Sequence, residues 1–410
     1  MIYWTLYLKR IILLSHHCSI KYTFNHLLCL NTPRMTQQTK DKIRELAKQH
    51  GFELCAFTRP HINTIDQEAL DRWVDAKMFG EMDYMGEEVR TMRRKQPATM
   101  LDGIQSVISL GFPYAAPDDV EVTPQQGVIA SYARGDDYHE LMKKKLKALA
   151  RDLDVLLGEH GQRVYVDTAP VLEHALAAKG GLAWQGKHSL SINRDYGSWF
   201  FLAELFTTAN IEPDTEATLH CGTCTDCIPA CPTGAIVSPY VVDARLCISY
   251  LTIEFNGFIP ENLRKPMGNR IFGCDDCQTV CPWNQKAKKP EIDFLKPRED
   301  TFLPNLARLL NLDDDGFRQM FRKSAIKRTK RAGLLRNVCI AMGNSGDVSF
   351  VPQLLDVLQD NEPLLRGHAV WALTQLTAGD TDVQQQIQLL KDNEQHKDVL
   401  AEIAGFERII

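Results

Sequence analysis

Three features are absent from this sequence of 410 residues, and each absence excludes a class of protein. No apolar run approaches the ~20 residues that span a bilayer, so we expect a cytoplasmic protein without a membrane anchor. Basic residues are not in excess, because the formal net charge is −5, and any nucleic-acid-binding surface would have to be local. There is neither a G-x-G-x-x-G motif nor a P-loop, so the common nucleotide-binding loops are missing as well.

Acidic residues are also absent from residues 1–34, which carry four basic residues and short apolar stretches interrupted by histidines. A signal peptide needs a continuous apolar centre and a small-residue cleavage site, and neither is clear here. We therefore interpret residues 1–34 as an extension, either non-native or disordered, and expect the folded protein to begin at Met35. The alternative is a genuine targeting or membrane-binding segment.

Helical and strand patterns alternate between residue 35 and about residue 210. Ile43, Leu46 and Ala47 share one face of an amphipathic helix. We expect further helices at 141–157 and 170–179, and strands at 52–57, 107–112, 163–166 and 198–205. Such alternation predicts an α/β domain that is built around a mixed sheet.

Residues 300–410 have a helical pattern with an internal repetition. The triplet Leu-Leu-Arg at 334–336 recurs at 364–366, is followed each time by an apolar stretch, and brackets an expected helix at 351–358. Paired helices at such a period are typical of HEAT-like repeats, which bury one face by stacking. A chance recurrence within an ordinary helical bundle is the alternative.

Eight of the twelve cysteines fall between residues 211 and 295. A disulfide framework is typical of short secreted chains, whereas close spacing in a long chain favours metal binding. Residues 221–232 read C-x2-C-x2-C-x3-C-P, the bacterial ferredoxin motif, in which three thiolates bind one cluster and the fourth binds another. The two-residue turns let three thiolates converge on one cubane, and Pro232 discourages the chain from curling back.

A second run at 274–282 reads C-x2-C-x3-C-P and is one cysteine short, which Cys247 can supply. The count predicts a ferredoxin-like module at 211–295 with two [4Fe–4S] clusters, so the α/β domain should contain the electron acceptor. A four-thiolate zinc site is the alternative, but zinc ribbons lack the C-x3-C-P ending that occurs here twice. We assign one cluster to Cys221, Cys224, Cys227 and Cys281, and the other to Cys231, Cys247, Cys274 and Cys277.

Residues 166–187 combine a carboxylate with flexible backbone. Asp167 follows an expected strand and precedes Pro170 at the start of an expected helix, where it could simply cap that helix. The glycines at 180, 181 and 186 permit close backbone approach to a flat or phosphate-bearing ligand. These features are weak evidence when they are taken alone.

Several motifs together resemble the epoxyqueuosine reductase family. They are V-D-T-A-P-V-L-E at 166–173, G-L-A-W-Q-G-K at 181–187, C-I-S-Y-L-T-I-E at 247–254, the eight cysteines and the helical tail. The resemblance runs from Met35 to the C-terminus and implies a cobalamin-dependent iron–sulfur enzyme that reduces epoxyqueuosine, at the wobble position of tRNA, to the alkene of queuosine. It also implies a fold similar to that of the reductive dehalogenases, with a cobalamin-binding catalytic domain at 35–210.

The resemblance assigns roles to individual residues. Asp167 matches the family's proton donor, which protonates the alkoxide of the opened epoxide, and burial against the corrin would raise its pKa enough for this. Cluster electrons would reduce cobalt to the Co(I) state that acts on the epoxide. His139 lies in another family-like motif, but a lone histidine is more often structural, and we do not assign it as a cobalt ligand. The expected cobalamin contacts are Arg90, Asp167, Ser189, Ser191, Ser249 and Asp275.

Residues 318–336 contain eight basic residues and no acidic residue, directly before the expected repeats. Such a patch would bind a phosphate backbone with strong salt dependence. A solvated helix face is the usual alternative, but the interleaved acidic residues of such a face are missing. We therefore expect residues 300–410 to bind tRNA, through Arg322, Lys323, Lys327, Arg328, Lys330 and Arg331.

Two other functions stay open beside the leading one, for which we expect a monomer and an external reductant of the flavodoxin or ferredoxin type. A reductive dehalogenase would use the same cofactors, but it typically carries a twin-arginine export signal and has no reason for a basic helical tail. A ferredoxin-like electron carrier would leave the ~180 residues before the clusters without a role, which is more than a typical domain.

Overall fold

A four-stranded antiparallel sheet forms the centre of the N-terminal region in the computed structural model, which describes residues 36–116, 120–290, 296–377 and 379–408. The strands lie in the order β1 (Leu54–Thr58), β2 (Ser106–Pro113), β7 (Phe200–Thr207) and β4 (Gln162–Tyr165). All three pairings are antiparallel, so the prediction of a mixed sheet is wrong. Alternation along a chain does not determine which strands become neighbours, and β2 pairs along its whole length with the distant β7.

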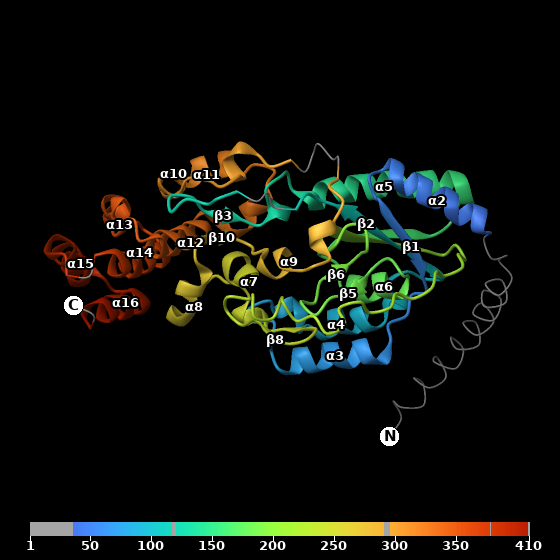
Figure 1. Ribbon diagram of the computed structural model, residues 1–410, viewed down its shortest axis with the longest axis horizontal. Helices are drawn as coiled ribbons and strands as arrows, with labels where there is room; N and C mark the ends of the chain where they lie inside the picture. The colour runs from blue at the N-terminus through green and yellow to red at the C-terminus, as the bar shows by residue number, and fades with distance from the viewer. Residues whose placement is uncertain (1–35, 117–119, 291–295, 378, 409–410) are drawn as a thin grey trace, which may run out of the picture.

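Helices cover both faces of this sheet, which explains why its central strands are apolar almost throughout. One face packs against α2 (Gln37–Gln49) and α5 (Tyr138–Leu157), and the other packs against α6 (Glu173–Lys179), with α3 (Thr64–Asp75) and α4 (Glu88–Lys95) beyond it (Figure 1). Along β7, Ala203 and Leu205 belong to the core on the α5 side, whereas Leu202 and Phe206 belong to clusters that include α6. Glu204 lies between the last two and therefore faces α6.

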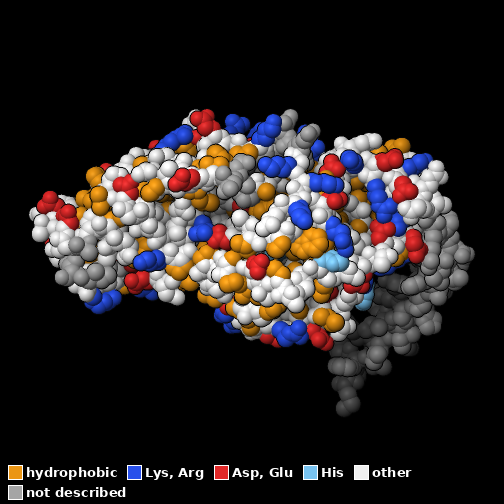
Figure 2. Space-filling view, viewed as in Figure 1, with side chains coloured by type: hydrophobic (Ala, Val, Ile, Leu, Met, Phe, Trp, Pro, Cys, Tyr) orange, Lys and Arg blue, Asp and Glu red, His pale blue; other side chains and the backbone are white. Residues whose placement is uncertain are grey.

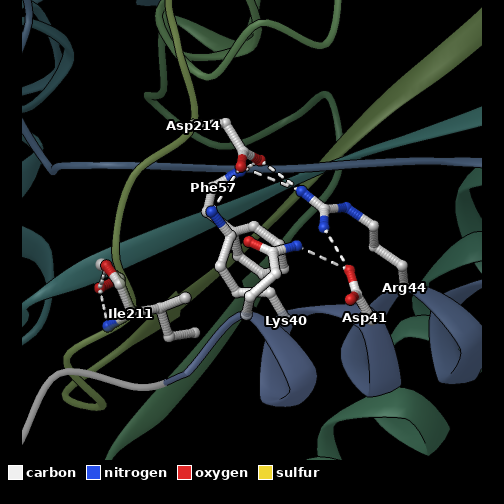
Figure 3. Close-up of polar contacts among 8 residues, drawn as sticks. Lys40, Asp41, Arg44, Phe57, Ile211 and Asp214 are labelled. Carbon is white, nitrogen blue, oxygen red and sulfur yellow. Dashed lines mark hydrogen bonds and ion pairs between the residues drawn. The ribbon is translucent and has the colours of Figure 1, made fainter.

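Asp214 ties α2 to the edge of the sheet (Figure 3). Its carboxylate accepts hydrogen bonds from Lys40 Nζ at 2.5 Å, from Arg44 Nη2 at 2.9 Å and from the Phe57 backbone N–H at 3.1 Å. Only 6% of the Lys40 side chain is exposed, so its ammonium group depends on this carboxylate. The network therefore holds the first helix against β1.

The Asp214→Ala variant is expected to lose on the order of 2–4 kcal/mol of unfolding free energy, because the buried Lys40 charge and one strand N–H lose their acceptor. Urea unfolding of the anaerobically prepared protein measures this loss. The matched control is Asp41→Ala, which removes only exposed contacts, the ion pair with Arg44 and a hydrogen bond from Gln37, and should cost less than about 1 kcal/mol. Equal losses in the two variants would contradict the prediction.

The segment with the cysteines lies between the sheet and a helical arm (Figure 1). Its elements are short, and loops carry most of the cysteines. A parallel pair of strands, β3 (Val128–Ile129) and β10 (Arg270–Phe272), joins this segment to the N-terminal region. The other elements here and in the preceding glycine loop are β5 (Trp184–Gln185), β6 (Ser191–Ile192), β8 (Ile236–Ser238), β9 (Val241–Val242), α7 (Ile248–Ile253), α8 (Glu261–Met267) and α9 (Asp276–Thr279).

The arm is helical, and α12, α14 and α16 pack against one another in succession. Arg336 on α12 is fully buried and donates hydrogen bonds to the carbonyl oxygens of Leu251, Phe255 and Gly257, so it fastens the arm to the end of α7. Burial lowers the pKa of Arg336 to about 9. The helices are α10 (Leu306–Leu310), α11 (Asp314–Met320), α12 (Lys330–Ser345), α13 (Val351–Val357), α14 (Pro363–Leu376), α15 (Thr381–Asn393) and α16 (Lys397–Glu407).

Two further sequence predictions concern residues 1–34 and the absence of a membrane-spanning segment. The interpretation of residues 1–34 lies outside the described residues. Within the described ranges, no helix combines the length and the apolar character that crossing a bilayer requires.

Candidate active site

The eight predicted cysteine ligands fall into two neighbouring sets: the four members of one line a single cavity together, and Cys221 and Cys281 of the other share an apolar cluster. In set one, burial raises the pKa of Cys227 to about 11, and the other three members add to the increase. In set two, burial raises the pKa of Cys277, again with contributions from the other three members. Set one is Cys221, Cys224, Cys227 and Cys281, and set two is Cys231, Cys247, Cys274 and Cys277.

Each set offers four thiolates, which is the ligand complement of a [4Fe–4S] cluster. Among the residues that the structure describes, no three or more His, Cys, Asp or Glu side chains converge closely enough to hold a single metal ion. A zinc site would require such convergence, whereas a cubane takes one thiolate on each of its irons. The donor set therefore fits two cubanes.

A cavity of about 380 Å³, here called cavity one, connects set two with the α/β domain. Its wall includes all four cysteines of set two, and at the other side it includes Asp167. Three of the predicted cofactor contacts, Ser189, Ser191 and Ser249, line it as well. A ligand in cavity one would therefore touch the second cluster's ligands and the predicted acid at once.

Two larger cavities meet cavity one at Asp167, which lines all three. Cavity two has a volume of about 1000 Å³ and is lined by Arg90 and by residues of α3, α4 and α6. Cavity three has a volume of about 990 Å³ and is lined by His139, Lys327 and Arg328. Asp167 thus stands where a bound cofactor and a substrate that enters from the basic segment would meet.

Asp167 is held by polar contacts in a strained backbone conformation. Its φ of 52° lies in the left-handed region, which a non-glycine residue adopts at a cost of about 1–3 kcal/mol. Tyr138 donates its hydroxyl hydrogen to Oδ2 at 3.0 Å, His139 Nε2 lies 2.7 Å from the same oxygen, and Glu173 accepts the Asp167 N–H at 2.8 Å. The alternative role as a helix cap is wrong, because α6 begins after Leu172 and no side chain caps it.

The pKa of Asp167 contradicts one expectation. Burial raises it, as predicted, but hydrogen bonds from His139 and Tyr138 and the positive charge of His139 lower it more, so the pKa lies below its ordinary value. Burial lowers the pKa of His139, yet bonds to Asp137 and Asp167 raise it more, to about 9. At neutral pH the proton therefore resides on the imidazole, between two carboxylates.

His139 is a residue of the site to which the sequence analysis assigned no role, and the structure places it beside Asp167. Its Nδ1 lies 2.8 Å from Asp137 Oδ1, and the same aspartate caps the first turn of α5 by accepting the His139 N–H. An aspartate two residues before a histidine at a helix start was a usable signal for such an oriented imidazole. The second carboxylate, Asp167, comes from a distant segment and left no signal near His139.

The predicted cofactor contacts do not all reach a cavity. Arg90 donates to the Thr168 carbonyl oxygen at 3.1 Å, and its buried Nε has no hydrogen-bond partner among the described residues. Ser191 Oγ is 2.7 Å from His174 Nδ1 on the wall of cavity one. Asp275 instead accepts hydrogen bonds from the backbone N–H and hydroxyl of Ser131, at 2.7 and 2.9 Å, and lines none of the three cavities.

His188 is a further cavity residue, and its hydrogen bonds determine its tautomer. Its Nδ1 accepts the Leu190 N–H at 3.2 Å, so Nε2 carries the hydrogen of the neutral ring. Burial lowers the pKa of His188 to about 4, which keeps the ring neutral. Nε2 is buried on the wall of cavity one and has no partner among the described residues, so a ligand with a carbonyl oxygen would satisfy it.

The basic segment is less uniform than its sequence suggests, because acidic residues from other segments reach it. Arg331 pairs with Asp360 at 2.6 Å and is largely buried, and Arg328 pairs with Glu254 at 2.9 Å. The segment is also not one helix, since a short 3-10 helix at 325–329 separates α11 from α12. Figure 2 shows Lys and Arg side chains gathered along the upper part of the face in view, with Asp and Glu side chains among them.

Comparisons with known proteins agree with this geometry. A family model described as "Epoxyqueuosine reductase QueG, DUF1730" matches residues 94–168, and one described as "4Fe-4S double cluster binding domain" matches residues 220–284. The second match contains all eight assigned cysteines, so the module binds iron–sulfur clusters and the zinc alternative is set aside.

Relatives of known name match most of the chain. The epoxyqueuosine reductase of Xanthomonas campestris pv. campestris is 41% identical over 340 residues, which cover 82% of this chain and 95% of the relative. A crystal structure of epoxyqueuosine reductase with a tRNA-Tyr epoxyqueuosine-modified stem loop is 28% identical, has a TM-score of 0.84, and matches 91% of this chain and 98% of that one. A Bacillus subtilis structure with its catalytic aspartate loop swung out of the active site has a TM-score of 0.82, 28% identity, and coverage of 91% and 99%. The chain therefore belongs to the epoxyqueuosine reductase family.

Proposed function

We propose that this protein reduces epoxyqueuosine to queuosine at the wobble position of tRNA, with electrons that pass through two [4Fe–4S] clusters to bound cobalamin. The observation that carries the proposal is cavity one, whose wall contains the four thiolates of set two and also Asp167. A redox cofactor there lies between an electron source and an acid. For these roles we divide the chain into a catalytic domain at 35–210, a cluster module at 211–295 and a HEAT-like tRNA-binding domain at 300–410.

The residues of cavities one and two fit cobalamin, whose corrin carries many amide groups around its edge. Glu173, His174 and Ser189 line both cavities, so the two adjoin, and we propose that one large ligand extends across both. The orphaned N–H groups of His188 Nε2 and Arg90 Nε suit amide carbonyl oxygens. We propose the cobalamin contacts Arg90, Asp167, His188, Ser189, Ser191 and Ser249.

The reaction requires two protons at one oxygen atom. An epoxide that gains two electrons and two protons gives an alkene and water, and cobalamin, when it is bound, supplies the electron pair. The alkoxide that forms when the first C–O bond breaks is a poor leaving group until it has been protonated. The task of the protein chain is therefore to hold protons beside the substrate oxygen.

The pair of His139 and Asp167 performs this task. As negative charge develops on the substrate oxygen, the proton on His139 Nε2 passes along the hydrogen bond to Asp167 Oδ2, which lies 2.7 Å from that nitrogen, and Asp167 passes a proton to the substrate oxygen. Asp137 fixes the orientation of the imidazole and stabilises its charge. One quarter of the His139 side chain is exposed, so solvent can return a proton for the second transfer.

The structure narrows the proposed tRNA surface. Arg322, Lys323 and Lys330 are exposed, and we propose them as phosphate contacts. Lys327 and Arg328 line cavity three, where a base that has been splayed out of the anticodon loop would enter. Arg331 pairs with Asp360 and so stabilises the fold, and we no longer propose it as a contact of the RNA.

The triple variant R322A/K323A/K330A is expected to bind an anticodon stem loop more weakly at every salt concentration. If each residue neutralises one phosphate, the slope of log K against log salt concentration falls by about 2–3, because each contact contributes ~0.7–0.9. Fluorescence anisotropy at several salt concentrations measures the slope. The control is Lys42→Ala, an exposed lysine on α2, and an unchanged slope in the triple variant would remove the surface from the proposal.

Anaerobic turnover tests the whole function. The protein, reconstituted with iron, sulfide and cobalamin and reduced by a flavodoxin or ferredoxin, should convert an epoxyqueuosine stem loop to the queuosine product. A chlorinated phenol serves as the alternative substrate. Turnover of the phenol alone would favour a dehalogenase, and absence of turnover and of a corrin absorption band would favour an electron carrier.

A further inference from the structure

Two glutamates, the fully buried Glu204 and the partly buried Glu173, lie beside the Asp167 loop and have no part in the proton transfer described above. Glu204 sits in the middle of β7 with no exposed surface, between Leu202 and Phe206 on the α6 face. The carboxyl of Glu173, the first residue of α6, lies within hydrogen-bond reach of the Glu204 carboxyl. No donor among the described residues satisfies either oxygen of Glu204.

Two carboxylates in such a place share a proton. Burial raises the pKa of Glu204 well above its ordinary value, and the charge of Glu173 raises it further. Burial and the charge of Asp167 raise the pKa of Glu173 to about 7. Because no other donor in the described part of the chain reaches the buried oxygens of Glu204, a proton held between the two carboxyl groups would remove their mutual repulsion.

The Glu173 side chain also grips the catalytic loop. Its Oε1 accepts the backbone N–H of Asp167 at 2.8 Å, the residue whose φ of 52° is unfavourable for a non-glycine. Glu173 is fixed by the start of α6, and α6 is fixed against β2 and β7. A chain of contacts thus runs from the central strand, through Glu204 and Glu173, to the peptide of Asp167.

We propose that Glu173 is a positioning residue for Asp167, and that Glu204, which is fully buried on the strand behind it, supports Glu173 through a proton that the two carboxyl groups share. The contact selects the backbone conformation in which the Asp167 carboxyl meets His139 and Tyr138. This inference rests on the proposed function only for the role of Asp167. The effect of the hydrogen bond between Glu173 and the Asp167 backbone can be measured without substrate.

The test compares Glu173→Ala, which removes the acceptor, with Glu173→Gln, which keeps an oxygen in its place. Hydrogen–deuterium exchange of peptides that contain residues 166–168, in the full chain with its clusters, measures how firmly Glu173 holds the Asp167 backbone N–H. We expect hydrogen exchange in Glu173→Ala to be about 10-fold faster. The kcat should be about 100-fold lower, because small misplacements of a catalytic group have effects of this size. The KM for the stem loop should be unchanged within about 2-fold. Glu173→Gln should stay close to the parent protein in all three.

Infrared spectroscopy tests the proton on Glu204. The parent protein should show the carbonyl-stretch band of a buried protonated carboxyl, Glu204→Gln should lack it, and the exposed control Glu159→Gln should keep it. Iron content of the variants establishes that they fold. Parent-like exchange in Glu173→Ala, or a band that survives in Glu204→Gln, would overturn the proposal. If exchange is faster in Glu173→Ala but the parent protein does not reduce epoxyqueuosine, the positioning role of Glu173 is retained and the proposed function is refuted instead.

Discussion

The Asp167→Asn variant is expected to reduce epoxyqueuosine about 10²- to 10⁴-fold more slowly than the parent protein, which is the usual contribution of a positioned acid. Asparagine keeps the size of the side chain and an oxygen that can face Tyr138, but it cannot pass a proton from His139 to the substrate. Single-turnover assays with the anaerobically reduced protein and an epoxyqueuosine stem loop measure the rate. Iron content should be unchanged, because no cluster ligand is altered, and the corrin absorption band should persist, because Asp167 is only one of the six proposed cobalamin contacts and asparagine keeps its size.

A second readout separates this chemical role from a structural one. Asp167 raises the pKa of His139 through a hydrogen bond and through its charge, so the pKa should fall from about 9 in the variant. An NMR titration of the His139 ring follows this change. Asp136→Asn is the matched control, an exposed aspartate three residues before His139, and should alter neither quantity. Retained turnover in Asp167→Asn would remove Asp167 from its role as the donor.

The presence of a double-cluster module could be predicted from the sequence, because the spacing of its cysteines is local. The C-x2-C turns place neighbouring thiolates side by side whatever the rest of the chain does, whereas the assignment of individual cysteines to set one and set two stays a prediction from the ferredoxin motif. The strands at 107–112 and 198–205 were also recognisable, since burial on both faces of the sheet requires continuous apolar runs. Their antiparallel pairing was not, because no short segment contains it.

The pKa values of the active-site carboxyl groups could not be predicted from the sequence for the same physical reason, because residues from distant segments determine them. The pKa of Asp167 depends on Tyr138 and His139, which lie about 30 positions earlier in the chain. The shared proton of Glu204 depends on a helix that packs on its strand. For the basic segment the sequence overstated the number of unpaired positive charges. Glu254 and Asp360 come from other segments and pair with two of its arginines, Arg328 and Arg331. Titration behaviour is thus a property of packing, and a motif predicts only which residues take part.

Replacing Cys277 with Ala is expected to reduce the iron content from about eight to about four atoms per chain, because set two loses a ligand and set one keeps all of its own. Cys277 also lines cavity one, so binding of cobalamin should weaken and epoxide reduction should be lost almost entirely. Iron and sulfide analysis after anaerobic reconstitution measures the first effect. Absorption spectroscopy with added cobalamin and a turnover assay measure the other two.

The Cys224→Ala variant makes this prediction specific to the position of set two. It should lose the same amount of iron, but from the set that does not border cavity one, and should therefore still bind cobalamin. Cys55→Ala, a cysteine of β1 outside both sets, should keep all of its iron. Equal loss of cobalamin binding in the Cys224 and Cys277 variants would mean that the cavity depends on both sets. In that case the position of set two on the wall of cavity one would not explain the loss, and set two could no longer be proposed as the cluster that adjoins cobalamin.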